Sequence, residues 1–365
     1  MSKIKDKINE KREARREEKA KKQNITQQNI EESRDEILAK GKKFKYPFQY
    51  AKHRLIINAI AIGLVAIIMF VLVGWVQLYK SLNTSEVMYR FTRTIPLSVA
   101  DVDDVKVRFS DYLMLYRSSI RSVERQQGEL GDTDEAEKER RQFMRQALTD
   151  AEDYSYAMAK LKEIGKEVSE EEIDEVITEH KTIDGELRSD EAFEGIVKDN
   201  FGLSIKEYRR LIMLSLARKK VSAELDKDAK ELADQIEEML AENNNDMKKV
   251  ANEFANNKTI ALEEVDSVEY ANLDGGRAMV ASQLGDVGDV SQRFVSKSGD
   301  GYYFVKLVDR TDTTVSYQSI WIRFDWFNNM MQKLRDDGKV HEKITIELLE
   351  GDDEVPEDDG PEKVD

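Results

Sequence analysis

The sequence contains no cysteine, only four prolines and only three histidines among its 365 residues. Without cysteine, no disulfide, thiolate metal site or thiol nucleophile can form. No proline lies between residues 97 and 355, which suits a mostly helical body because proline removes a backbone donor and clashes with the preceding turn. The few histidines form no zinc or catalytic-triad pattern, and no glycine-rich phosphate loop occurs. We therefore predict no metal site and no cofactor.

Charged residues are abundant and unevenly distributed. They make up 36% of the chain, whose formal net charge is −16. Residues 1–54 hold 17 basic and 9 acidic side chains, whereas residues 81–365 carry a net charge of −25. Basic residues next to a membrane span stay on the cytoplasmic side. This asymmetry sets the orientation of any membrane helix between the two segments.

One long uncharged run begins at Leu55 and ends at Tyr79. A helix of this length rises about 37 Å, enough to cross a hydrocarbon core of about 30 Å. Trp75 and Tyr79 lie where an aromatic belt at the membrane interface is expected. The run is too long and too uniformly apolar for a buried core helix, and it starts too late for a cleaved signal peptide. We predict a single-pass protein of the cell membrane, with this helix in the lipid bilayer.

The orientation follows from the charges. Residues 1–54 form a charged cytoplasmic arm, and residues 81–365 lie outside the cytoplasm. Such an arm is a solvated helix or disordered, and solubilising the chain is the simplest role for it. Acidic residues are interspersed among its basic ones, so no binding of nucleic acid is expected.

Regular apolar spacing predicts several helices after the membrane segment. Residues 87–93 are taken as a connector, and residues 97–109 as two short strands around an Asp103-Asp104 turn. Ser169 with Glu172, and Ser204 with Glu207, have the spacing of capping boxes, which mark helix starts. The helices are expected to begin at 110 and to cover 143–164, 170–179, a segment around 193–202, and 205–225.

The pattern changes after residue 228. Residues 229–255 fit two helices separated by three asparagines. Strands are expected at 265–272, 290–295, 301–308 and 315–324, with a short helix at 278–284. A helix at 326–334 and an extended or helical segment at 340–348 follow. The acidic residues 350–365 are expected to be disordered.

The order of these elements over residues 97–345 resembles the SurA/PpiD/PrsA family of extracytoplasmic foldases. RFSDYLMLYRSSI (108–120), AMAKLKEIGKEVSEEEIDEVI (157–177) and FEGIVKDNFGLSIKEYRRLIMLSLARKKV (193–221) are similar to the SurA-type chaperone domain. Residues 229–255 and LGDVGDVSQRFVSKSGDGYYFVKLVDR (284–310) are similar to a parvulin-type prolyl isomerase. The resemblance implies a helical chaperone domain followed by a parvulin-like domain, in a PpiD-like layout.

The parvulin resemblance lacks the family's catalytic residues. Tyr303 replaces its second histidine, and Gln283 replaces the phenylalanine that pairs with the methionine at Met279. The family's first strand is missing before residue 229. A similar strand appears late, at 316–324, without a histidine. We therefore expect an isomerase-like domain with little or no activity, and surface roles for His53, His180 and His341.

Two residue groups remain open to a structural or a functional interpretation. Trp321, Phe324, Trp326 and Phe327 form an aromatic group, which either packs in the core or offers an apolar surface to clients. Asp101, Asp103 and Asp104 lack the spacing of a calcium loop and are interpreted as turn acids.

The predicted fold is mainly α with a small α+β domain and one transmembrane helix. The expected segments are an arm (1–54), a transmembrane helix (55–79), a connector (80–96), a SurA-like chaperone domain (97–228), a degenerate parvulin-like domain (229–311), a strand and helix that pack back on the chaperone domain (312–348), and an acidic tail (349–365).

The predicted function is that of a membrane-anchored chaperone. It would hold unfolded or nascent exported polypeptides, with the export channel as a further partner. Two alternatives stay open: a structural adaptor for one envelope partner, and an active prolyl isomerase with a rebuilt site.

Overall fold

The computed structural model describes residues 2–23, 30–31, 33–38, 40, 50–183, 185–272 and 274–347. The chain divides into two units, Met1–Trp75 and Val76–Asp365. The predicted acidic tail, residues 349–365, lies outside the described residues. The prediction of a mainly helical chain with a small α+β part is confirmed.

The first unit contains two long helices, α1 (Ser2–Gln23) and most of α3 (Tyr50–Tyr79). Among the described residues, Arg54–Tyr79 is the helical stretch that is long and apolar enough to cross a membrane. Its side chains are exposed, with Ile62 69% and Phe70 62% accessible. A helix in the core of a soluble protein would bury such side chains. The exposure therefore argues against the core-helix alternative.

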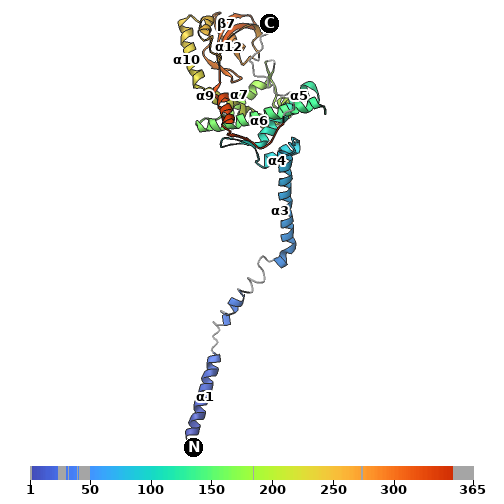
Figure 1. Cartoon of the computed structure of the whole chain (residues 1–365), viewed down its shortest axis with the longest axis vertical. Coiled ribbons are helices and arrows are strands. Elements are labelled where there is room, and N and C mark those ends of the chain that lie inside the picture. Colours follow the sequence, from blue (N-terminus) through green and yellow to red (C-terminus); the bar gives the residue numbers. More distant parts are fainter. Residues whose placement is uncertain are drawn as a thin grey trace. The chain divides into compact units, whose positions relative to one another are not determined.

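The second unit begins with the last turn of α3, and Figure 1 shows the elements that follow. Its helices are α4 (Glu86–Thr94), α5 (Phe109–Gln127), α6 (Asp134–Glu163), α7 (Glu170–Lys181), α8 (Asp190–Phe201), α9 (Ile205–Leu225), α10 (Lys227–Glu242), α11 (Met247–Glu253), α12 (Arg277–Gln283) and α13 (Trp326–Asp336). Its strands are β1 (Ser98–Val102), β2 (Val105–Arg108), β3 (Thr182–Ile183), β4 (Glu186–Leu187), β5 (Ile260–Glu269), β6 (Phe294–Val295), β7 (Gly301–Arg310), β8 (Thr314–Arg323) and β9 (Val340–Glu342).

Local sequence signals place most helix ends correctly. Both predicted capping boxes form, at Ser169 with Glu172 and at Ser204 with Glu207. Gly202 ends α8 in the left-handed region, with φ 67°, which glycine adopts without steric cost. Two expectations were wrong. Helix α6 begins nine residues before the predicted residue 143, since Thr133 caps it, and the predicted connector at 87–93 is helix α4.

The helical part of the second unit (residues 76–225 and 326–347) has one continuous core. This core joins Leu78 at the end of α3, the facing sides of α5, α6 and α9, and the apolar side of α13. A small sheet of order β2-β1-β9 completes it, with β1 antiparallel to both neighbours. The last strand of the chain therefore pairs with the first strand of this part, which ties the C-terminal segment to the helical core.

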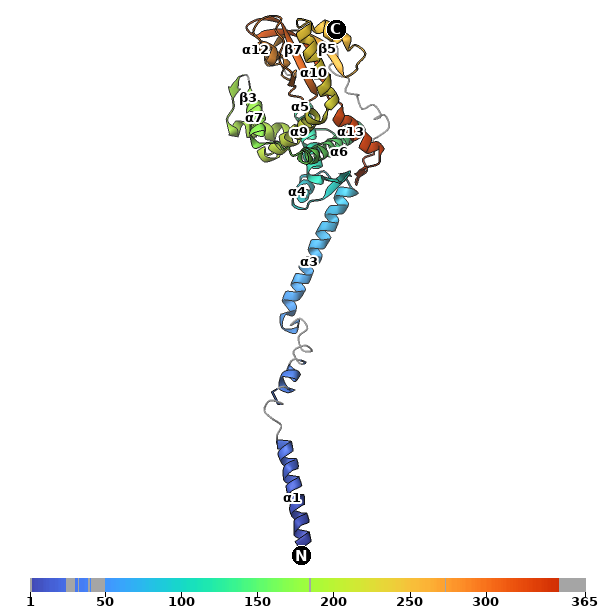
Figure 2. The same ribbon diagram turned by 90° about the vertical axis from the view of Figure 1, so that its left-hand side faces the viewer.

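The α+β part (residues 227–324) is built on an antiparallel sheet of order β5-β8-β7-β6. Phe304 and Ile320 face a core formed with α10 and α11, whereas Val305 and Tyr317 face α12. Because side chains alternate along a strand, the sheet lies between α12 on one face and α10 with α11 on the other (Figure 2). The strand predicted late in the sequence, β8, lies at the centre of this sheet.

The expected boundary at residue 312 requires correction. We expected 312–348 to pack back on the helical part as one piece. Strand β8 instead pairs on both sides within the α+β sheet, and only α13 and the residues after it contact the helical core. The reason is physical: residues 315–322 alternate apolar side chains on two faces, which two layers of helices cover.

Candidate functional site

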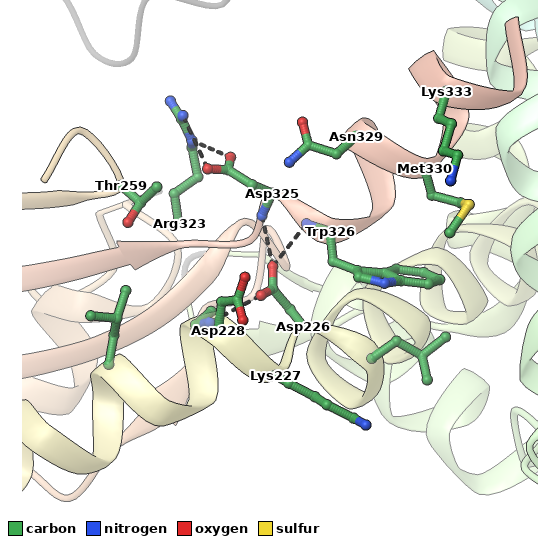
Figure 3. Close-up of a pocket in the computed structure, with 13 residues that line it drawn as sticks. Asp226, Lys227, Asp228, Thr259, Arg323, Asp325, Trp326, Asn329, Met330 and Lys333 are labelled. Atoms are coloured by element: carbon green, nitrogen blue, oxygen red, sulfur yellow. Dashed lines mark hydrogen bonds and ion pairs between the residues drawn. The ribbon is translucent and has the colours of Figure 1, made fainter. Parts of the chain in front are cut away.

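The chain crosses between the helical and α+β parts twice, and one carboxylate binds both crossings. Asp226 lies between α9 and α10 and is 4% exposed. Its Oδ1 accepts a hydrogen bond from the backbone N–H of Ala229 (3.0 Å). Its Oδ2 accepts two more, from the N–H groups of Asp325 (2.7 Å) and Trp326 (2.9 Å), at the start of α13 (Figure 3). Asp226 is therefore the N-cap of α10, and the same carboxylate also holds the start of α13, where the chain returns to the helical part.

A cleft surrounds this junction, here called the hinge cleft. It has a volume of about 750 Å³ and is lined by residues of the α9–α10 junction, the end of β8 and α13. Trp326 and Met330 lie along α13, while Arg323 is held by Asp325 through a hydrogen bond of 2.6 Å (Figure 3). The lining mixes apolar side chains with charges of both signs, and it comes from both parts of the second unit.

A second cleft, called the apolar cleft, lies between the helical part and the loop after β6. It has a volume of about 650 Å³. Its floor comes mainly from one face of α9, including Leu211 and Leu216, together with Val176 of α7 and Tyr154 of α6. Val295, 38% exposed, closes it from the α+β part. Partly buried apolar side chains at the meeting of two domains are the usual lining of a binding site.

Polar contacts at the rim hold the apolar cleft closed at one end. Lys219 of α9 donates a hydrogen bond to the carbonyl of Lys297, and Lys297 forms an ion pair with Glu179 of α7. Gly299 approaches Lys219 so closely, at φ 74°, that a Cβ there would clash with the lysine side chain. The loop containing residues 296–300 is thus fitted against α9.

The electrostatics of this rim are set by burial. Burial lowers the pKa of the Lys219 ammonium group, while Glu179 opposes that shift. The Tyr208 hydroxyl lies 2.8 Å from His180 Nδ1, and burial raises the pKa of Tyr208. His180 itself is exposed, in line with the surface role expected for it. These groups frame an apolar surface.

The predicted isomerase positions lie on the α12 side of the sheet. Tyr303 is 4% exposed and donates a hydrogen bond to Asp300 Oδ2 (2.9 Å). Its ring stacks on Trp321, with centroids 6.1 Å apart, and on Phe294, at 6.0 Å. Burial and the Asp300 carboxylate raise the pKa of Tyr303. The phenol is therefore neutral and held as a donor, so it cannot serve as a base at neutral pH.

An arginine covers the same face. The Arg277 guanidinium lies 5.2 Å above the Tyr303 ring and forms an ion pair with Glu263 of β5. Tyr317 donates a hydrogen bond to Asp274 Oδ2 (2.7 Å). On the same face, the Ser319 hydroxyl and the Trp321 indole N–H are buried without a hydrogen-bond partner among the described residues. Met279 is 42% exposed and Gln283 is exposed on α12, so neither joins Tyr303 in a closed pocket.

The structure separates the four aromatic residues that the sequence grouped together. Phe324 and Phe327 are buried, at 5% and 1% exposure, in two different cores. Trp321 stacks on Tyr303. Trp326 alone lines a cleft, the hinge cleft of Figure 3. As candidates for client contact, the buried phenylalanines are replaced by Trp326 and by the lining of the apolar cleft.

The predicted membrane-interface residues differ in their surroundings. Trp75 is 43% exposed and belongs to the first unit. Tyr79, in the second unit, donates a hydrogen bond to the carbonyl of Ser98 (2.6 Å) and packs edge-on against Phe109 at 5.3 Å. Tyr79 therefore anchors the end of α3 to the folded body. The turn acids are also engaged, since Asp101 pairs with Lys343 (2.8 Å).

Sequence reasoning missed Asp226, Lys219 and the loop that meets them. The signal available for Asp226 was an aspartate three residues before Ala229, a spacing typical of an N-cap. Its second role, across 99 residues of sequence, has no local signature. The same holds for Lys219, whose partner Lys297 is 78 residues away.

Comparison with protein families gives one match, to the SurA-like N-terminal domain, over residues 48–222. The match includes α3 and α4 and ends near the end of α9, so it starts well before the predicted domain boundary at residue 97. Comparisons with curated proteins and with solved structures gave no match. Residues 48–222, a little under half of the chain, are thus similar to the SurA-like N-terminal domain.

Proposed function

We propose that this protein is a membrane-anchored chaperone that holds unfolded segments of exported polypeptides in the apolar cleft. SurA-like domains bind unfolded polypeptides in general, and residues 48–222 match such a domain. The observation that carries the proposal is the apolar cleft of about 650 Å³, lined mainly by α9 and closed by Val295. Apolar side chains of α9, with polar groups at the rim, suit clients of varied sequence.

The anchor in this proposal is α3, with the N-terminal arm in the cytoplasm and the second unit outside it. Support comes from the apolar stretch Arg54–Tyr79 and from the excess of basic residues before it. Anchoring restricts the cleft to a thin layer beside the bilayer, which raises its effective concentration near emerging chains. The export channel is a partner in this proposal for the same reason.

We further propose that prolyl isomerase activity is lost in the α+β part. Isomerisation needs a shaped pocket that stabilises a twisted amide, against a barrier of about 18–20 kcal/mol. At the position of the family's second histidine, Tyr303 is stacked between rings and covered by Arg277. The α+β part then serves as the second wall of the apolar cleft.

The test is suppression of aggregation by the full chain in neutral-lipid nanodiscs, with chemically unfolded citrate synthase as client. The wild type is expected to suppress aggregation at near-stoichiometric ratios. The double variant Val295→Asp with Leu216→Gln is expected to lose most of this effect, because charge and amide groups disfavour apolar segments in the cleft.

A matched control carries Val287→Asp with Leu187→Gln. Val287 is 66% exposed and Leu187 is 62% exposed, and neither lines the cleft. This control should act like the wild type. Equal suppression by both double variants would exclude the apolar cleft as the site. A folded wild-type chain without any suppression would exclude the chaperone and favour an adaptor for a single partner.

A further inference from the structure

A third cleft, called the basic cleft, opens among α4, α5, α7 and α9 and has a volume of about 560 Å³. Five of its lining residues are cationic, and three are carboxylates. The cations are Arg93, Arg108, Lys206, Arg209 and Arg210. An excess of positive charge is unusual here, because residues 81–365 carry a net charge of −25.

Three of these cations are neutralised within the protein. Arg210 pairs with the buried Asp111 at 2.5 Å, Arg93 pairs with Glu207 at 2.7 Å, and Arg209 pairs with Glu170. The structure gives Arg108 and Lys206 no ion pair within the described part of the chain, and both side chains are exposed. The rim thus presents two cations whose charge is available to an anion.

The basic cleft also has an apolar part, called its floor. Met114 of α5, Ile173 of α7 and Met213 of α9 form it beside the Tyr89 ring, next to the buried Ser110 and Asp111. A cationic rim above an apolar floor fits a ligand with an anionic head and a hydrocarbon tail. Methionine side chains adapt readily to a flexible tail.

The cleft also lies beside the end of α3. Arg108 precedes Phe109, whose ring packs against Tyr79, the last residue of that helix, at 5.3 Å. Tyr89 and Arg93 belong to α4, which begins at Glu86, shortly after α3 ends. With α3 as the proposed membrane anchor, α4 and its side of the cleft follow the anchor directly in the chain.

We infer that the basic cleft binds one anionic phospholipid. Its phosphate lies between Arg108 and Lys206, and part of an acyl chain lies on the Met114–Met213 floor. Attraction between basic side chains and acidic head groups is short-ranged and favourable at a membrane surface. The inference rests on the membrane anchoring proposed above, and it is independent of client binding in the apolar cleft.

The test uses the full chain in nanodiscs of equal parts phosphatidylcholine and phosphatidylglycerol, released for native mass spectrometry. The wild type is expected to retain phosphatidylglycerol in preference to phosphatidylcholine. The double variant Arg108→Gln with Lys206→Gln should retain about tenfold less of it, as expected for the loss of two basic contacts. A matched control, Lys198→Gln with Lys230→Gln, removes the same charge from exposed sites and should retain as much as the wild type.

Several outcomes would overturn the inference. One is equal retention by all three chains, and another is an equal loss in the control, which would indicate general charge attraction. Inorganic phosphate or an acidic apolar peptide that binds through Arg108 and Lys206, without retention of phosphatidylglycerol, would assign the cleft to that ligand. Co-sedimentation of each chain with vesicles separates this result from a failure of anchoring, which would affect all three chains alike.

Discussion

The apolar cleft and the α12 side of the sheet differ in how their polar groups are used. Each of these two regions contains tyrosines, a basic side chain and a carboxylate. At the cleft, the polar groups of Lys219 and Lys297 lie at the rim and leave the α9 face open. On the sheet, Arg277 and Glu263 pair across the surface and cover Tyr303. A charged pair therefore covers the α12 side of the sheet, whereas an apolar surface with polar edges is open to ligands.

The largest expected effect tests whether α13 belongs to the helical core. Phe327→Ala removes a side chain that is 1% exposed and packs near Tyr156, with ring centroids 6.3 Å apart. The loss of buried area and the cavity left behind should lower the free energy of unfolding by about 3–5 kcal/mol. Urea unfolding of the full chain in neutral detergent measures this. Val287→Ala, at an exposed site, should change it by about 0.5 kcal/mol or less. A loss for Phe327→Ala no larger than that would refute the packing of α13.

The next effect concerns the junction between the two parts. Asp226→Ala leaves one buried and two partly buried N–H groups without an acceptor and should lower the free energy of unfolding by about 2–4 kcal/mol. The exposed neighbour Asp228→Ala serves as control. Hydrogen exchange adds a second measurement, since the amides of Asp325 and Trp326 should exchange faster only in the Asp226 variant. Unchanged exchange at those amides would show that Asp226 does not hold the second crossing.

A pH-dependent effect of intermediate size is expected at Glu152, on α6 facing α13. It is 1% exposed, and burial raises its pKa from 4.5 to about 7. Between these values the folded state keeps a proton that the unfolded state has lost, so this group makes stability fall as pH rises through that window. Glu152→Gln should match the wild type at pH 5 and exceed its free energy of unfolding by about 1–2 kcal/mol at pH 8. A difference in the free energy of unfolding that stays constant between pH 5 and pH 8 would contradict the raised pKa of Glu152.

The smallest effect sharpens the comparison on the sheet side. Arg277→Met removes the ion pair with Glu263 and the contact with the Tyr303 ring, and should cost about 1–2 kcal/mol. Lys248→Met breaks the more exposed pair with Glu264, and should cost about 0.5 kcal/mol or less. Proline isomerisation assays on both variants should remain at background. Isomerase activity in the wild type that Arg277→Met abolishes would instead indicate a rebuilt active site.

Much of the fold was predictable because its signals are local. The capping boxes at Ser169 and Ser204, the glycine at 202 and the asparagine turn before α11 each act within one helical turn. The start of α6 was missed because its first turns are charged and lack an apolar stripe. Helix α4 was missed because nine residues carry too little periodicity to distinguish a helix from a connector.

The sequence by itself determined the apolar helix, the charge difference across it and the helical body, since each depends on residue type and short-range spacing. Only the tertiary structure decided which aromatic side chains are exposed and that β8 lies at the centre of its sheet. It also decided that Asp226 accepts hydrogen bonds at both crossings, and that Arg108 and Lys206 line the same cleft. These features join residues about a hundred positions apart, and their distances depend on how the helices pack.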